Sequence, residues 1–239
     1  APMPRTVTDA ETIAAAARAN DEGWRHEADD AYQRAIAAFS RAIEIRPDYG
    51  AAYFGRAWVR DRANSLDAAH DDYSWAIRLS PSLAVAYANR GVVQLYRNQA
   101  ALAARDFAST LDLGDPELKR YAMLWRYVAM SRLGENARRQ LEKNAADINL
   151  SPWPGVLIRF FLGQASVDQV LAATDAENPG TRREKRCVGY FFLGQHYLLR
   201  GDATRAAAYF RDTVATGLNS FVQHTAAQRE LARLGASPR

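Results

Sequence analysis

The sequence predicts an all-α protein built from stacked helical hairpins. Small residues, aromatic residues and prolines recur along its first half with one period of 34 residues. Three alanines stand one period apart, at Ala35, Ala69 and Ala103. An aromatic residue follows each alanine four places later, at Phe39, Tyr73 and Phe107. A proline closes each copy, at Pro47, Pro81 and, one residue late, Pro116.

A 34-residue period of this kind is typical of tetratricopeptide repeats, in which each copy is a helix, a turn and a second helix. The alanines let the two helices approach closely, the aromatic fills the adjacent gap, and proline ends the second helix. We therefore predict a tetratricopeptide solenoid that coils as a right-handed superhelix. Its 239 residues leave room for about seven hairpins, so one elongated solenoid is expected.

The pattern divides the chain into four parts. Residues 1–10 contain two prolines and are expected to form a loose N-terminal arm. Residues 11–116 hold three regular repeats, and residues 117–186 form a degenerate helical hairpin and an irregular helical segment. The repeat pattern returns in residues 187–239 as a tetratricopeptide-like pair. A last helix there would cover the apolar face that the end of a solenoid leaves open.

Polar residues and prolines mark the expected ends of helices. Asp29 or Asp30 is predicted to cap the second helix of repeat one, and Ser65 that of repeat two. Asn98 stands in the equivalent turn of repeat three. Further on, Asn178-Pro179-Gly180 is predicted to be a loop.

Charge and hydropathy exclude some classes of partner. The 31 basic and 27 acidic residues give a net charge of +4, a mild excess that does not point to nucleic acid. One local basic group, residues 182–186, would either meet an acidic surface or form a solvated helix start or loop. The sequence contains no run of 18 apolar residues, so no membrane span is predicted.

Metal and catalytic chemistry find little support. The single cysteine, Cys187, excludes an intramolecular disulfide and is expected to pack as a small apolar residue. The four histidines are not spaced as metal ligands. Glycine-rich phosphate loops and nucleophile elbows are missing, and the paired carboxylates Asp29-Asp30 and Asp71-Asp72 are expected at caps or exposed faces. We predict a protein that is not an enzyme and has no cofactor or metal.

The first helix of each repeat lines the concave face of such a solenoid, so its outward side chains decide what binds. The repeat register predicts twelve partner-binding residues: Asn20, Trp24, Glu27, Phe54, Trp58, Asp61, Arg62, Val85, Ala88, Val92, Leu95 and Tyr96. The aromatic members suit the anchor residues of a partner helix or an extended peptide. Alternatively, the N-terminal arm, the C-terminal helices or a second subunit covers them.

A known variant of this groove clamps the terminal carboxylate of a peptide with cations. The equivalent positions here hold no cation: Asn20, Trp24, Gly55, Val85 and Asn89. Binding of a chaperone tail is therefore not expected.

The irregular second half resembles the NlpI lipoprotein family of bacterial envelope tetratricopeptide proteins. The resemblance is carried by Leu124, Trp125, Tyr127, Ala129, Trp153, Phe161, Leu162, Gly163, Phe191, Leu193-Gly194, Tyr197-Leu198, Gly201-Asp202, Phe221-Val222, His224, Glu230-Leu231 and Leu234-Gly235. It implies a periplasmic, dimeric, non-enzymatic adaptor that brings cell-wall hydrolases to a processing protease.

The lipid-bearing N-terminal cysteine of that family has no counterpart here. The sequence begins with Ala-Pro-Met-Pro-Arg. This start is either the mature end that remains after removal of a secretion signal or the boundary of a fragment. A cytoplasmic location is the alternative to the periplasmic one.

A homodimer is also expected, because Trp125, Trp153 and Phe160 in the irregular middle segment need cover. A homodimer would be consistent with a second, alternative function. Copies of the chain would fill one another's grooves, and structural self-assembly would then be the main role of the protein.

Overall fold

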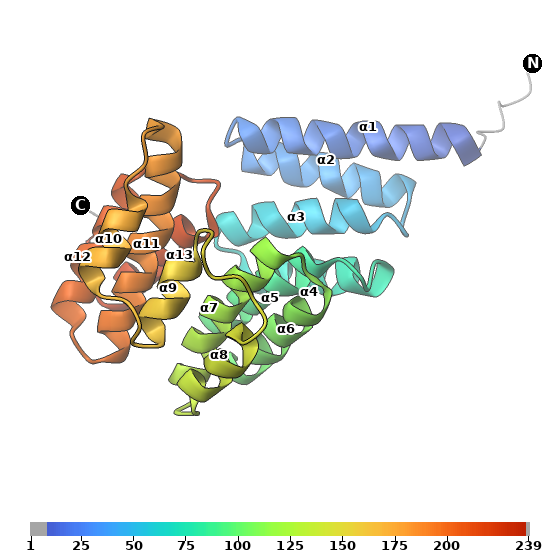
Figure 1. Ribbon diagram of the computed structural model, residues 1–239. Coiled ribbons are helices and arrows are strands. Elements are labelled where there is room, and N and C mark those ends of the chain that lie inside the picture. Colours follow the sequence, from blue (N-terminus) through green and yellow to red (C-terminus); the bar gives the residue numbers. More distant parts are fainter. Residues whose placement is uncertain (1–8, 238–239) are drawn as a thin grey trace, which may run out of the picture. The chain divides into compact units, whose positions relative to one another are not determined.

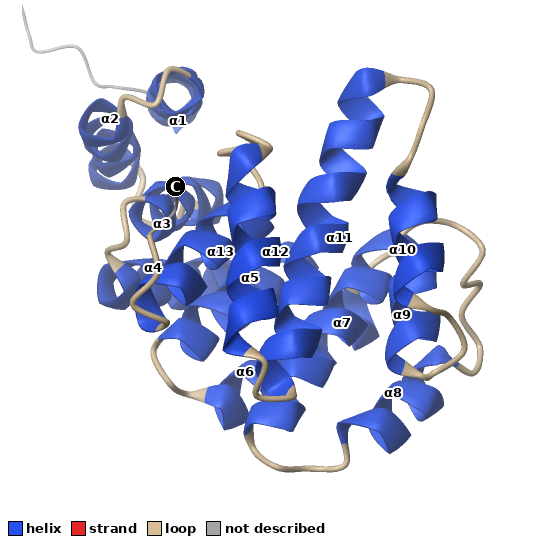
Figure 2. Cartoon of the chain, turned by 90° about the vertical axis from the view of Figure 1, so that its left-hand side faces the viewer, coloured by secondary structure: helices blue, strands red, loops and turns tan. Residues whose placement is uncertain are grey.

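The computed structural model describes residues 9–237, and this part of the chain contains thirteen α-helices and no strand (Figures 1 and 2). The all-α prediction is confirmed. Residues 1–8 of the predicted arm lie outside the described residues, whereas Asp9 and Ala10 already belong to the first helix. Acidic residues in that first turn favour a helix start there. The chain forms two compact units, residues 1–113 and 114–239.

Unit 1 consists of three helical hairpins in sequence. Their helices are α1 (Asp9–Ala28), α2 (Tyr32–Ile45), α3 (Gly50–Arg62), α4 (Leu66–Leu79), α5 (Ala84–Tyr96) and α6 (Ala100–Leu113). Within each pair the two helices pack together, and the second helix also contacts the first helix of the next pair. The first helices contact one another in turn, α1 with α3 and α3 with α5, so they share one face of the unit.

Each hairpin of unit 1 turns through one residue in the left-handed backbone region. These residues are one repeat period apart, at Asp30 (φ 54°), Asn64 (φ 59°) and Asn98 (φ 60°). Asp and Asn tolerate positive φ better than other side chains do.

This turn geometry corrects the predicted caps. Ala31 is the N-cap of α2, whereas Asp30 takes the left-handed position and accepts a hydrogen bond from the Tyr32 hydroxyl (3.0 Å). Ser65 is the N-cap of α4 as predicted, but its side chain makes no cap hydrogen bond. The turn itself starts each second helix, so no side-chain cap is needed.

The repeated aromatic residue fills the space between neighbouring helices. A Cβ atom placed on Gly23 of α1 would lie 2.7 Å from the Phe39 ring, and one on Gly55 of α3 would lie 2.4 Å from it. Phe107 stands in the same relation to Gly91, at 2.8 Å. The predicted pairing of small and aromatic residues is confirmed, with glycine as well as alanine supplying the space.

A half-buried arginine joins the second hairpin to the first. The Arg56 guanidinium donates two hydrogen bonds of 2.8 Å to the Asp72 carboxylate on α4, and a third of 3.0 Å to the Ser40 hydroxyl on α2. Arg60 donates to the same carboxylate at 2.6 Å. Asp72 is only 3% exposed, so the prediction of an exposed Asp71-Asp72 pair is wrong for Asp72. Burial is possible because two arginines neutralise this carboxylate.

The same linkage recurs one period later. Arg90 on α5 donates to the Asp106 carboxylate on α6 at 2.7 and 2.8 Å, and to the Ser74 hydroxyl on α4 at 3.1 Å. We call the two sets together the arginine ladder. It fixes each hairpin against the one before it.

Unit 2 is less regular. Its helices are α7 (Pro116–Arg132), α8 (Ala137–Ala145), α9 (Gly155–Phe161), α10 (Val167–Thr174), α11 (Pro179–Leu199), α12 (Ala203–Ala215) and α13 (Val222–Arg233). Helix α11 is central, because it contacts α7, α9, α10, α12 and α13. The last helix, α13, packs on α11 and α12, as the prediction of a covering helix required.

The start of α11 differs from the prediction. Pro179 and Gly180 belong to its first turn rather than to a loop, so the helix begins well before residue 187. Asn178 caps it by accepting a hydrogen bond from the Thr181 amide (3.0 Å). Proline is tolerated at the first helical position because the amide hydrogen that it lacks has no helical partner there.

The aromatic residues that were expected to need a second subunit are largely covered within unit 2. Trp125 is 4% exposed and packs on Phe191 and Phe192 of α11, with ring centroids 5.0 and 5.5 Å away. Phe160 lies 4.7 Å from the His196 ring, and Trp153 is half-buried. Trp125 therefore needs no second subunit, whereas Trp153 and Phe160 remain half-exposed, and the homodimer stays a prediction.

The arginine ladder yields a prediction about stability. Asp72→Ala leaves Arg56 and Arg60 without their carboxylate, and we expect it to lower the free energy of unfolding by about 3 kcal/mol. Asp71→Ala, at the exposed neighbouring position, is the matched control and should change it little. Urea titrations of the three proteins measure the difference. Equal stabilities for the two variants would show that the ladder does not hold the hairpins together.

Candidate protein-binding surface

The first helices of unit 1 bring three of the predicted aromatic residues onto one face. The Trp24 ring on α1 lies 6.4 Å from the Phe54 ring on α3, and Trp58 stands one turn further along α3. Trp24 also meets Phe39 edge-on at 5.2 Å, and Phe54 meets Tyr73 at 5.8 Å. All three are half-buried, so each is at once part of the core and part of the surface. We call Trp24, Phe54 and Trp58 the aromatic face.

A charged pair fixes Trp58. Its indole nitrogen donates to a Glu27 carboxylate oxygen at 3.0 Å, and the Arg62 guanidinium pairs with the same oxygen. Arg62 also donates to Asp30 at 3.2 Å and lies 5.3 Å from the Tyr32 ring centre. Its side chain is 7% exposed, and burial lowers the pKa of the guanidinium. Glu27 and Arg62 therefore position Trp58 instead of standing free for a partner.

The other predicted binding residues fall into two groups. Two are half-buried: Val85 and Ala88. Five are buried: Asn20, Asp61, Val92, Leu95 and Tyr96. In this conformation only the half-buried residues add surface to the aromatic face.

Each of the two asparagines at the clamp positions has one unsatisfied side-chain atom. The side-chain oxygen of Asn20 and the side-chain nitrogen of Asn89 are buried without a hydrogen-bond partner. Such a group costs about 1–3 kcal/mol when it is left unpaired.

Sequence reasoning missed a second aromatic surface on unit 1. Trp75 on α4 is 45% exposed and stacks on Tyr53 of α3, with ring centroids 5.9 Å apart. The Arg78 guanidinium lies 5.1 Å from the Trp75 ring centre. Tyr53 recurs one period later as Tyr87, and this repetition was the available signal.

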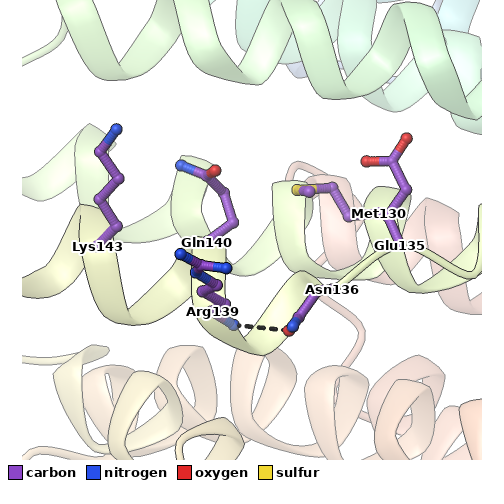
Figure 3. A pocket seen from close by; sticks show the side chains of 6 residues that line it. All are labelled: Met130, Glu135, Asn136, Arg139, Gln140 and Lys143. Carbon is purple, nitrogen blue, oxygen red and sulfur yellow. Dashed lines mark hydrogen bonds between the residues drawn. The ribbon is translucent and has the colours of Figure 1, made fainter.

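An open hollow of about 510 Å³ lies on the α7–α8 hairpin of unit 2 (Figure 3). Figure 3 shows the side chains of Met130, Glu135, Gln140 and Lys143 pointing the same way from this hairpin. Arg139 completes the charged lining, and its backbone amide donates to the Asn136 side chain at 3.1 Å. One acid and two bases leave a mixed surface with no distinct chemical preference.

Two further observations concern residues 9–237. These residues include no group of three or more His, Cys, Asp or Glu side chains arranged to hold a metal ion. No helix among them is both long enough and apolar enough to cross a membrane.

Solved structures of other proteins share this fold, whereas no family model matches the sequence. A tetratricopeptide repeat protein from Parabacteroides merdae is 18% identical, with a TM-score of 0.57 over 90% of this chain and 84% of that one. MamA is 13% identical, with a TM-score of 0.53 over 94% and 96% of the two chains. The pilF protein of Pseudomonas aeruginosa is 14% identical, with a TM-score of 0.53 over 92% of this chain and 99% of that one.

These likenesses concern the fold alone. Together with the 34-residue repeat and the helical hairpins, they define the chain as a tetratricopeptide-fold protein. Tetratricopeptide arrays present extended surfaces for binding other proteins.

The buried thiol of Cys187 gives a second prediction. Burial raises its pKa to about 11, so the neutral thiol persists well above the usual titration range. Because the thiolate is the reactive form, we expect a colourless disulfide reagent to leave the folded protein unmodified near pH 8 to 9, about the ordinary thiol pKa. The same reagent should release one equivalent of chromophore in denaturant. Rapid reaction of the folded protein would contradict the burial.

The same shift has a consequence for stability. The pKa of the Cys187 thiol is higher in the folded chain than in the unfolded chain. The neutral thiol therefore contributes fully to the free energy of unfolding at any pH below the unfolded-state pKa. This contribution is lost as the pH rises through about 11. Cys187→Ala, compared with the parent chain across this range, isolates the effect.

Proposed function

We propose that this protein is a non-enzymatic adaptor that holds a helix or an extended peptide of a protein partner on the aromatic face. The observation that carries the proposal is the presentation of Trp24, Phe54 and Trp58, half-exposed, on two neighbouring first helices. Large aromatic side chains of this kind dominate the binding energy of protein interfaces.

The aromatic face is also held rigid before any partner arrives. Trp24 and Phe54 rest on Phe39 and Tyr73, and Glu27 fixes the Trp58 indole. Ordering flexible side chains costs binding free energy, and a preorganised surface avoids that cost. The face therefore has the properties of an anchor site.

The unsatisfied amides fit a peptide partner. Asn20 offers an acceptor and Asn89 a donor, and a peptide backbone carries the complementary N–H and C=O groups. Both atoms are buried, so a partner reaches them only if neighbouring side chains move. Pairing them would recover free energy that the chain loses alone.

The resemblance to the NlpI family supports the finer part of the proposal. On that basis the protein works in the bacterial cell envelope, in the periplasm, and brings cell-wall hydrolases to a processing protease. A cytoplasmic adaptor is the alternative location. Structural self-assembly as a homodimer is the alternative function.

Trp58→Ala is the variant that tests the aromatic face. All three aromatic side chains also pack on core residues, but Trp58 is in addition fixed by a hydrogen bond to Glu27. Trp75→Ala removes an exposed tryptophan from the second helix and is the matched control. We expect Trp58→Ala to weaken partner capture at least about tenfold, the cost of losing a hot-spot residue, while Trp75→Ala captures normally.

The measurement is affinity capture from a native-source extract, with captured proteins identified by mass spectrometry and folding checked by circular dichroism. Hydrolases or a protease that are lost only with Trp58→Ala would support the adaptor. Equal capture by all three proteins would refute the aromatic face. Recovery of the bait alone, with a dimer by sedimentation, would favour self-assembly.

A further inference from the structure

The first eight residues of α11 carry an unusual concentration of positive charge. Four cations stand there, Arg182, Arg183, Lys185 and Arg186, and the first turn contains no acidic residue. Cations in the first turn of a helix oppose its macrodipole, and of these four only Arg182 stands in that turn. Sequence features that break a local stability rule are concentrated at functional sites.

Internal partners neutralise little of this charge. Arg182 and Arg186 share one carboxylate, Asp175, at 2.9 and 3.7 Å, and this carboxylate is 68% exposed. Lys185 lies 5.9 Å from the Trp153 ring centre. Arg183 is exposed and makes no ion pair or hydrogen bond with the rest of residues 9–237. The cluster therefore keeps a net positive charge.

Three of these arginines line a hollow of about 500 Å³ between α11 and α12. Its lining is Pro179, Arg182, Arg183, Arg186, Tyr190, Asp212, Ala215 and Thr216. The Tyr190 ring lies 6.2 Å from that of Tyr209, which gives the hollow an aromatic edge. The lining holds three guanidinium groups and the Asp212 carboxylate, and Asp175 pairs with two of these arginines, so a net positive charge remains.

We propose that this hollow, which we call the arginine hollow, binds an acidic segment of a protein partner. Arg183, Arg186 and Tyr190 are spaced at three and four residues, so they share one side of α11. Successive cations on that stripe are about 4.5 Å apart along the axis, close enough to meet neighbouring carboxylates of one peptide. Guanidinium groups bind carboxylates through paired hydrogen bonds.

The surroundings favour a short acidic segment over a nucleic acid. The net charge of the whole chain is only +4, without the broad basic surface that nucleic acids require. The arginine hollow lies in unit 2 and is independent of the aromatic face.

The proposal predicts the direction in which replacing Asp212 changes the affinity for an acidic peptide. Burial raises the pKa of its carboxyl, and no cation lies within ion-pair distance of it among the described residues. A carboxylate in this place opposes an acidic ligand, so Asp212→Asn should strengthen binding about two- to fivefold, the size of one exposed charge interaction. Loss of an arginine should have the opposite effect.

The experiment uses the full chain and a fluorescein-labelled peptide of alternating Glu and Ser, measured by fluorescence anisotropy at low salt. We expect Arg183→Glu with Arg186→Glu to weaken binding about tenfold, from two lost attractions and the added repulsion. Arg105→Glu is the matched control, because Arg105 is exposed on α6 and makes no ion pair within residues 9–237. A peptide of alternating Gln and Ser should not bind.

Thermal unfolding separates binding from folding. Arg183 is exposed, and Arg186 makes only a long contact of 3.7 Å with the exposed Asp175, so the double variant should melt close to the parent chain. Lower stability together with weaker binding would instead mean that these arginines are structural, and the proposal would fail.

Two further outcomes would overturn the proposal. The first is a double variant that binds the acidic peptide as tightly as the parent chain does, or an Arg105→Glu variant that loses as much peptide affinity as the double variant. The other is binding to phosphatidylserine vesicles that depends on Arg183 and Arg186 while the acidic peptide does not bind, which would identify the ligand as a membrane surface.

Discussion

The arginine ladder determines how the hairpins of unit 1 are placed. Arg56 reaches from its own helix to Asp72 in the same hairpin and to Ser40 in the hairpin before it. The Asp72 carboxylate is buried and Arg56 half-buried, so a shift of one hairpin against the next would leave charge unpaired in a low dielectric. The ladder therefore fixes the register at which first helices meet, and with it the approach of Trp24 to Phe54.

The aromatic face shows why binding and stability are coupled in this fold. Trp24 and Phe54 each present one side to solvent and rest the other on a repeat aromatic. Trp58 packs on the core cluster of Ala35, Phe39 and Val59 and is also fixed by its hydrogen bond to Glu27. A partner would thus dock on side chains whose positions are already set by the core, which lowers the entropy lost on binding.

The two units distribute their charge differently. In unit 1 the ladder arginines form ion pairs with buried carboxylates, so they contribute to the specificity of packing and add little surface charge. In unit 2, Arg183 is exposed and makes no ion pair within residues 9–237. The first arrangement contributes to the fold, whereas the second leaves positive charge available to a partner.

The sequence by itself determined the helical-hairpin repeat, because alanine, aromatic and proline at one period have a steric meaning that is independent of context. The burial of Asp72 and the cover of Trp125 were decided only by the tertiary structure. Each depends on side chains that are distant in sequence, such as Arg56 for Asp72. Periodicity reports which face of a helix is apolar, but not which charge or ring the fold brings against it.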